Sequence, residues 1–413
     1  METIRIIRSG DARAVAALGV PVAARDGAVA QRVAAIVDDV RRRGDRAVLG
    51  YARQFDDLRG AIEVSRSEIA AAERAIPASV RRALRTAAAH IRRVARAQVP
   101  KAARVRVVPG VVIEQVVTPL RRVGCYVPAG RYPLPSSLLM AAIPARVAGV
   151  ETVIAVCPRP DAVVLAAAKI AGVDRVFRVG GAHAVAALAY GTRTIPRVDR
   201  IVGPGSTWVA EAKALVSRDC AIDFYAGPSE IVIVSDRAPA AWIAADMLAQ
   251  AEHDVEARAI FITTRAALAR QVQAELARRV PPTGPARESL ARRGAIVIAR
   301  SASEAVELAD QLTPEHLVCD DASTASRIRS GTTFVGAWSA QAAGDYATGS
   351  NHVLPTSGAA RFRGGLSAAD FVRVTSRQRL TESGLRRLAP TIIALAEAEG
   401  LQAHADSIRE RCR

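Results

Sequence analysis

The chain has 413 residues, of which 50% are hydrophobic, with 57 Lys and Arg against 40 Asp and Glu and a formal net charge of +17. At ~100–200 residues per domain, this length predicts two to four domains, and the absence of any run of ~20 uncharged apolar residues argues against a membrane span. Five scattered cysteines without a CxxC pair exclude a zinc-finger spacing and argue against a disulfide framework. The charged N-terminus lacks the apolar segment of a signal peptide, so we expect a cytoplasmic protein.

The positive charge does not predict a nucleic-acid partner. Lysine occurs at three positions only, and arginines are spread over the whole length with dense runs limited to 41–43 and 81–96. A nucleic-acid-binding protein usually gathers its basic residues on one face or along one helix. We expect no such partner, although a basic surface would help to steer an anionic cofactor.

The first hundred residues read as helical. Residues 28–49 and 80–98 both repeat apolar side chains at near-helical spacing. Few groups suited to catalysis occur in this part. We therefore expect residues 1–104 to form a helical segment that acts as a scaffold or dimerisation element.

Residues 105–225 change to an alternation of strands and helices. A hairpin around Pro109-Gly110 comes first, and the alternation that follows predicts a parallel sheet covered by helices. The expected strands are 122–127, 152–157, 175–179 and 200–202, and the expected helices are 135–147, 161–171, 182–189 and 206–216.

The same alternation resumes over residues 226–335 and predicts a second α/β unit. Residues 336–371, rich in Gly, Ala and Ser, read as a long ordered loop, and such loops are usually functional. With helices expected at 382–398 and 401–410, residues 336–413 form an active-site loop and a small C-terminal helical tail. The strands expected in the second unit are 231–234, 259–263, 294–299, 316–318 and 333–335, and the helices are 240–252, 265–279 and 302–311.

Four of the six histidines lie close to an acid or an amide, which are donors suited to a metal ion. Gln250 and His253 are three apart at a predicted helix and share a face; the alternative is a surface Gln and a capping His. Glu315-His316 places an acid beside a base that could shuttle protons and activate water; the alternative is a helix cap that begins at Thr313.

The remaining two clusters lie near the C-terminus. Asp345 offers a hard oxygen ligand and His352 a hydrogen bond to substrate, unless Asp345 only closes a turn. Glu399 and His404 flank a helix start, where a surface polar pair is the alternative. One metal ion needs about four donors, so these residues together predict a metal-assisted enzyme whose site is gathered from residues 250–413.

Two glycine turns stand at strand–helix junctions. The segments 180–183 (GGAH) and 203–206 (GPGS) present backbone N–H groups and a helix N-terminus to an anion. Neither is a complete GxGxxG, so tight turns without a ligand remain an equal alternative.

Six longer motifs are specific enough to indicate a family. With them the chain resembles the histidinol dehydrogenases from about residue 30 to the C-terminus, which implies two successive incomplete Rossmann-like parallel-sheet units. The motifs are VGCYVPAG at 123–130, IPRVD at 195–199, AGPSE at 226–230, QAEH at 250–253, PEHL at 314–317 and NHVLPT at 351–356.

The resemblance implies a zinc-dependent, NAD-linked oxidation of L-histidinol to L-histidine through the aldehyde, the last step of histidine biosynthesis. It implies a homodimer with one Zn²⁺ per subunit and sites completed across the interface. His316 would be the general base and Glu315 the water activator, and both would contact the substrate with the metal ligands. The implied zinc ligands are Gln250, His253, Asp345 and His404, with His404 coming from the partner subunit, and the further substrate-binding residues are Ser229, His352 and Glu399.

The implied NAD-contacting positions are Tyr126, His183 and Ser206. The family has Gln where this chain has His183, and Asn where it has Ser206. These two differences leave open a related NAD-dependent dehydrogenase of another polar alcohol, such as a sulfonated diol. The donor set alone would also permit a zinc hydrolase, which has no need of NAD.

Overall fold

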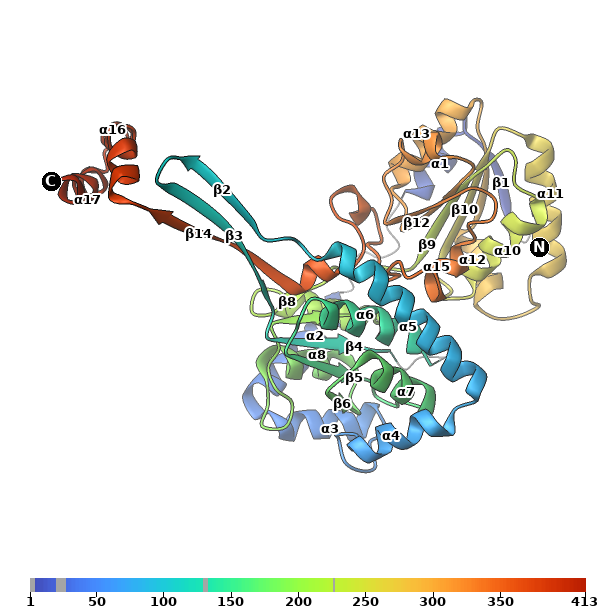
Figure 1. The fold of residues 1–413 in the computed structure, drawn as a ribbon. Helices are drawn as coiled ribbons and strands as arrows, with labels where there is room; N and C mark the ends of the chain where they lie inside the picture. Colours follow the sequence, from blue (N-terminus) through green and yellow to red (C-terminus); the bar gives the residue numbers. More distant parts are fainter. Residues whose placement is uncertain (1–3, 20–26, 129–132, 226) are drawn as a thin grey trace.

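The computed structural model describes residues 4–19, 27–128, 133–225 and 227–413. It consists of two lobes, each built on a parallel sheet, and an arm that projects from them and carries the C-terminus (Figure 1). The motif residues Ala129, Gly130 and Ala226 lie outside the described residues. The predicted α/β class with two successive sheet units is confirmed.

The first lobe contains a five-stranded sheet in the order β6-β5-β4-β7-β8, with every pair parallel. The order reverses beside β4, the first of these five strands along the chain, as in one half of a Rossmann fold. The strands are β4 (Arg122–Tyr126), β5 (Thr152–Val156), β6 (Arg175–Phe177), β7 (Arg200–Val202) and β8 (Ala221–Ile222), and the helices between them are α6 (Pro135–Val147), α7 (Ala162–Ala171), α8 (Gly181–Tyr190) and α9 (Thr207–Val216).

The second lobe repeats this strand order and adds one strand at its edge. Its six parallel strands follow the order β1-β11-β10-β9-β12-β13, and apolar clusters pack on both faces, as expected for a sheet covered on both sides. The strands are β9 (Glu230–Val234), β10 (Arg258–Thr263), β11 (Ala295–Ile298), β12 (His316–Cys319) and β13 (Thr332–Val335), and the helices are α10 (Ala240–Ala251), α11 (Ala266–Arg279), α12 (Pro285–Arg293), α13 (Ala302–Leu312) and α14 (Ala322–Ala325).

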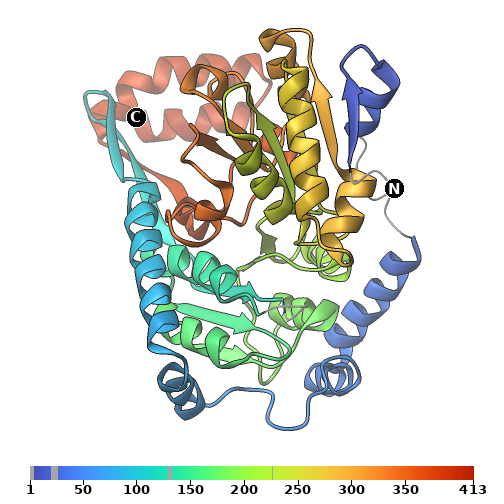
Figure 2. The same cartoon turned by 90° about the vertical axis from the view of Figure 1, so that its right-hand side faces the viewer.

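The N-terminal segment differs from the helical expectation in two places. β1 (Arg5–Arg8) pairs with β11 of the second lobe, and α1 (Ala12–Leu18) follows it. The single helix expected over 28–49 is wrong, because Gly44 takes φ 54° and separates α2 (Gly27–Arg43) from α3 (Asp45–Phe55). Glycine adopts this left-handed conformation without steric cost. The segment then continues as α4 (Arg66–Ala75) and α5 (Ala78–Gln98), with α5 along one side of the first lobe (Figure 2).

The arm is a three-stranded antiparallel sheet that ends in two helices. β2 (Ala103–Val108) and β3 (Val111–Pro119) form the predicted hairpin. β14 (Val372–Leu380), which the sequence did not predict, pairs with β3 along nine residues. Most residues of β2 and β14 are exposed. At the end of the arm, α16 (Glu382–Ala398) packs against α17 (Gln402–Cys412).

Residues 336–371 link the two lobes. The expectation of a loop throughout is wrong at α15 (Gln341–Tyr346), which packs against α10 of the second lobe. The short 3-10 helix Ala368–Phe371 packs against α5 and α6 of the first lobe. Residues 336–371 therefore pack against helices of both lobes before the chain enters the arm.

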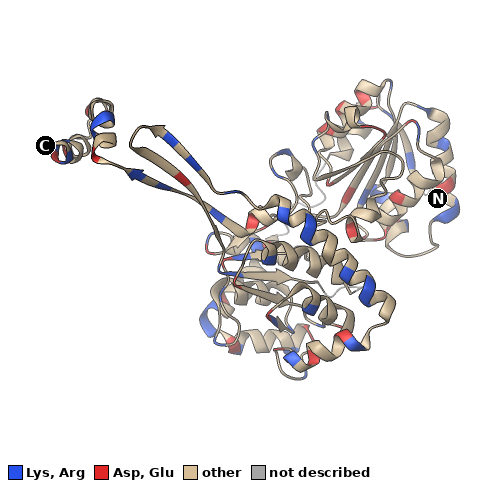
Figure 3. Ribbon diagram, viewed as in Figure 1, with Lys and Arg blue, Asp and Glu red and all other residues tan. Residues whose placement is uncertain are grey.

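Figure 3 shows Lys and Arg on both lobes and along the arm, with Asp and Glu distributed among them. All five cysteines are free thiols. In the parts of the chain that the structure describes, no helix is long and apolar enough to cross a membrane.

Candidate active site

Ser229 and Glu315 come together at the amino ends of two neighbouring strands. β9 and β12 pair in parallel, so the residues that begin these strands lie side by side. The Ser229 hydroxyl donates to Glu315 Oε2 at 2.6 Å, and the Glu230 backbone N–H donates to the same oxygen at 2.8 Å. A helix cap at this point is wrong: Thr313 ends α13 in a left-handed conformation, and the chain runs straight into β12.

His316 is held in the form of a neutral base. Its Nδ1 lies 3.1 Å from the backbone oxygen of Glu230; because a carbonyl only accepts, Nδ1 carries the proton and Nε2 keeps its lone pair. Nε2 lies 4.0 Å from Asp345 Oδ1. The ring is 3% exposed, and burial lowers the pKa of His316 below its ordinary value. A neutral imidazole with a free nitrogen is suited to accept a proton.

Glu315 is the acid beside this base. Its side chain is buried, with 5% of the residue exposed, and Oε2 lies 3.5 Å from His316 Nδ1. Burial raises the pKa of the Glu315 carboxyl to about 8, against the lowering effect of the hydrogen bonds from Ser229 and Glu230. A carboxyl that changes charge near neutral pH can serve as an acid or a base.

Gln250 is fully buried near the end of α10, and both polar atoms of its amide lack a hydrogen-bond partner. The alternative of a surface Gln is therefore wrong. His253 follows the helix, and its Nδ1 lies 2.9 Å from the Ala249 carbonyl, which leaves Nε2 free. Asp246 lies one turn before Gln250 on α10. Burial raises the pKa of Asp246 to about 6.

The linking segment supplies Asp345 and His352. Asp345 lies in α15 rather than in an isolated turn, and Gln341 Nε2 donates to its Oδ2 at 2.6 Å. His352 Nδ1 donates to the Asp345 backbone oxygen at 2.9 Å, and Ser137 Oγ of α6 lies 3.3 Å from Nε2. Ser137 stands at the start of α6, beyond the carboxyl end of β4. The site therefore lies where the first sheet's carboxyl edge approaches the second sheet's amino edge.

Three of the four expected metal donors lie in the second lobe and the linking segment: Gln250 on α10, His253 just after it, and Asp345 on α15. Electrostatic interactions connect His253 and Asp345 with Glu315, His316 and His352. Among the described residues, no three His, Cys, Asp or Glu side chains form a group that could hold a metal ion. The unpaired amide of Gln250 nevertheless fits such a group, because a buried polar atom normally has a partner and an amide oxygen can serve as a metal ligand.

Glu399 and His404 lie elsewhere in this chain. Glu399 ends α16 and His404 is in the first turn of α17, at the end of the arm and away from α10 (Figure 1). Both residues are exposed. Within one chain, the structure does not bring them to the other site residues.

The expected cofactor residues all lie at the carboxyl edge of the first sheet. Tyr126 ends β4, His183 is in the first turn of α8 after β6, and Ser206 precedes α9 after β7. In open α/β sheets, ligands bind at this edge, where the strand order reverses. Tyr126 Oη accepts a hydrogen bond from the Gly181 N–H at 2.9 Å. The Ser206 side chain makes no capping hydrogen bond, and the residue is exposed.

His183 faces the N-terminal helices. Its Nε2 lies 2.8 Å from Asp56 Oδ2, and the Gly180 N–H donates to the same oxygen at 2.9 Å. The ring is 2% exposed and lies near the rings of Tyr51 and Phe55. Sequence patterns did not point to Asp56. In the structure its carboxylate contacts both His183 and the Gly180 N–H, and it thereby connects the histidine with the glycine turn.

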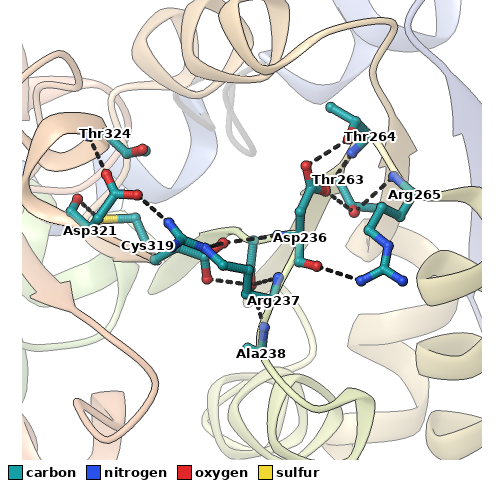
Figure 4. Close-up of polar contacts among 11 residues, drawn as sticks. Asp236, Arg237, Ala238, Thr263, Thr264, Arg265, Cys319, Asp321 and Thr324 are labelled. Carbon is teal, nitrogen blue, oxygen red and sulfur yellow. Dashed lines mark hydrogen bonds and ion pairs between the residues drawn. The ribbon is translucent and has the colours of Figure 1, made fainter.

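At the equivalent edge of the second sheet, polar side chains form hydrogen bonds and ion pairs with one another (Figure 4). The Asp236 carboxylate accepts hydrogen bonds from Thr263 and Thr264, and Asp320 accepts from Ser235 and from the Asp236 N–H. Arg237 pairs with Asp320 and Asp321. The cavity of about 190 Å³ at this edge is lined by these three carboxylates and by Arg237 and Arg327. The Glu315–His316 pair lies at the opposite, amino edge of the same sheet.

Two parallel sheets that meet at a buried acid–base pair define a two-lobed α/β enzyme, and comparisons with known proteins identify its family. The family model "Histidinol dehydrogenase" matches residues 22–412. The chain belongs to the histidinol dehydrogenase family and is thus a dehydrogenase.

Individual relatives agree with this assignment. The histidinol dehydrogenase of Methylococcus capsulatus is 44% identical over 93% of this chain and 92% of its own length. That of Aromatoleum aromaticum is 46% identical over 94% of this chain and 92% of its own. The crystal structure of histidinol dehydrogenase from Elizabethkingia anophelis superposes with a TM-score of 0.94 at 29% identity, covering 100% of this chain and 98% of that one.

Proposed function

We propose that this enzyme oxidises L-histidinol to L-histidine through L-histidinal in two NAD-linked steps, the last reaction of histidine biosynthesis, in the cytoplasm. The observation that carries the proposal is the unpaired Gln250 amide, which is fully buried in the helix that leads to His253. A free His253 nitrogen, Asp345 and the buried Glu315–His316 pair complete a site suited to a polar, nitrogen-bearing alcohol.

Gln250, His253 and Asp345 would hold zinc together with His404 of the partner subunit. Bound zinc would supply a Lewis acid that holds the substrate's amine and ring nitrogens. Ser229, His352 and Glu399 of the partner subunit would add hydrogen bonds to these groups. Because these contacts fix the substrate, its reacting carbon is held in one orientation.

His316 removes the hydroxyl proton in the first step. Nε2 takes this proton while the carbon-bound hydrogen leaves as hydride, and the product is an aldehyde. NAD accepts the hydride when it is bound. Tyr126 and Ser206 at the carboxyl edge of the first sheet are the residues we propose to contact it, with His183 supporting the turn behind them.

Glu315 acts in the second step. Its carboxylate takes a proton from the water that attacks the aldehyde, and transfer of a hydride from the resulting hydrate to a second NAD would yield the carboxylic acid. The Ser229 hydroxyl donates to Glu315 at 2.6 Å and holds the carboxylate in one orientation toward this water. Burial of both groups excludes competing water.

We further propose that two chains exchange their arms to complete each site. Glu399 and His404 are exposed at the end of the arm, with Leu395 on α16 60% exposed beside them. A thin sheet with exposed strands has little independent stability, so contact with a second copy would stabilise the arm. The result would be a homodimer with two sites.

The test uses purified, zinc-loaded protein with L-histidinol and NAD, and NADH formation as the readout. We expect two NADH per histidinol consumed, loss of activity after chelation, and recovery with added zinc. Absence of NADH above background in the metal-loaded protein would contradict the proposal.

An alternative alcohol remains a second candidate, and a panel that includes sulfonated diols would reveal it if histidinol were a clearly poorer substrate. The position of His183 gives this candidate little support, because its buried ring pairs with Asp56. A zinc hydrolase is not supported, since the family to which the chain belongs consists of dehydrogenases.

A further inference from the structure

Glu230 is a buried acid at the start of β9, the strand beside which the order of the second sheet reverses. Only 6% of the residue is exposed. The other four residues of this strand are apolar and buried. A charged residue in such a strand needs partners, because burying an unpaired carboxylate is costly.

The backbone of Glu230 contacts both members of the acid–base pair. Its N–H donates to Glu315 Oε2 at 2.8 Å, and its carbonyl oxygen lies 3.1 Å from His316 Nδ1. The first contact orients the Glu315 carboxyl, and the second sets the tautomer of His316. The position of this one peptide segment therefore determines how both groups face the substrate.

The Glu230 side chain extends to a third part of the site. Its carboxylate accepts a hydrogen bond from the Ser357 N–H at 3.0 Å, and Oε2 lies 3.6 Å from an Arg258 nitrogen. Ser357 has φ 54°, a left-handed conformation that costs a non-glycine residue energy unless its surroundings hold it. The segment held in this way, residues 351–357, carries His352.

We propose that Glu230 is a positioning residue for substrate binding: its carboxylate fixes segment 351–357, and with it His352, against the strand whose backbone orients Glu315 and His316. This inference rests on the proposed function, because His352 matters as a ligand of the substrate. Glu230 itself does not touch the reacting atoms. Arg258, 3.6 Å from Oε2, helps to hold the carboxyl group in place.

The test compares three variants at Glu230. Glu230→Ala removes the acceptor, and Glu230→Asp keeps the carboxyl group but shortens the side chain by one methylene. Glu230→Gln keeps an oxygen that can accept from Ser357. We expect the KM for L-histidinol to rise at least about tenfold in the Ala and Asp variants, since small displacements of binding groups have large kinetic effects. The kcat and the KM for NAD should change less, and Gln should restore most of the histidinol KM.

Glu275→Gln is the matched control, because Glu275 pairs with Arg278 and Arg279 on α11 of the same lobe. It should leave the histidinol KM unchanged. Folded Ala and Asp variants with a wild-type KM and only a lower melting temperature would reduce Glu230 to a structural role and overturn the proposal.

Hydrogen exchange separates this inference from the proposed function. The Ser357 amide should exchange at least about tenfold faster in the Asp variant than in wild type, whatever alcohol the enzyme oxidises. Unchanged protection would overturn the positioning role. Faster exchange without histidinol turnover in wild type would instead contradict the substrate assignment alone.

Discussion

Ser229 and Glu315, 86 residues apart in the sequence, share a hydrogen bond of 2.6 Å at the amino edge of the second sheet. The bond links the end of the AGPSE motif to the start of the PEHL motif. It exists because β9 and β12 are neighbours, although they are separated along the chain by β10 and β11. The chemistry of the site depends on this crossover.

The second oxidation step should accelerate as pH rises. Burial raises the pKa of Glu315 to about 8, so the carboxyl is mainly protonated below that pH and cannot accept a proton from water. With L-histidinal as substrate, the rate should climb through about pH 8 and then level off. A pH–rate profile checks this, with Glu315→Gln as control, and a flat wild-type profile would contradict it.

Substitution of the proposed general base and substitution of a proposed zinc ligand should differ in their effect on zinc content. His316→Ala should lower kcat by roughly 10²–10⁴-fold while zinc content stays near that of wild type. His253→Ala should lose the metal, because its free ring nitrogen is a proposed ligand. Metal analysis alongside turnover distinguishes the two, and a full zinc complement in His253→Ala would mean that the ligand assignment is wrong.

Complementation tests the proposed exchange of arms. His316→Ala and His404→Ala are each expected to be nearly inactive alone. In a mixed dimer, one of the two sites receives an intact His316 from one chain and an intact His404 from the other. Random pairing of equal amounts should therefore restore about a quarter of wild-type activity. No recovery after verified subunit exchange would indicate that both histidines act within the same chain.

Asp56 should affect cofactor binding from a distance. Asp56→Asn weakens the bonds to His183 and to the Gly180 N–H, and loss of about 1 kcal/mol would raise the KM for NAD roughly fivefold. The neighbouring Asp57, which pairs with Arg59 at the surface, supplies the control Asp57→Asn. Equal NAD affinity in both variants would exclude a role for the Asp56–His183 pair.

Periodicity predicted the two sheets because their strands and helices are strongly patterned, whereas the elements that depend on distant partners escaped it. β1 has only four residues and exists through its pairing with β11. β14 is exposed along most of its length, so it lacks the alternation that marks a half-buried strand. The division of 28–49 into two helices depended on the conformation of a single glycine.

The candidate site shows the same contrast between residues with a local sequence pattern and residues that depend on a distant partner. Gln250, Asp345 and the Glu315–His316 pair were predicted because an amide, acids and a base occur close together in short segments of the sequence. Asp56 gave no local signal, since its partner His183 lies 127 residues away. Glu230 did carry one: it is the only charged residue in an otherwise apolar strand, EIVIV.

The arm has a consequence for how the enzyme responds to its own abundance. When α16 and α17 complete the active site of the partner subunit, a monomer has no complete active site. Specific activity must therefore decline when the protein is diluted below the dissociation constant of the dimer. A truncated chain that lacks residues 372–413 could accept the helices of a full-length partner but would supply none. In such a mixed pair the lobe of the full-length chain would receive no helices, so only one of the two sites would be complete.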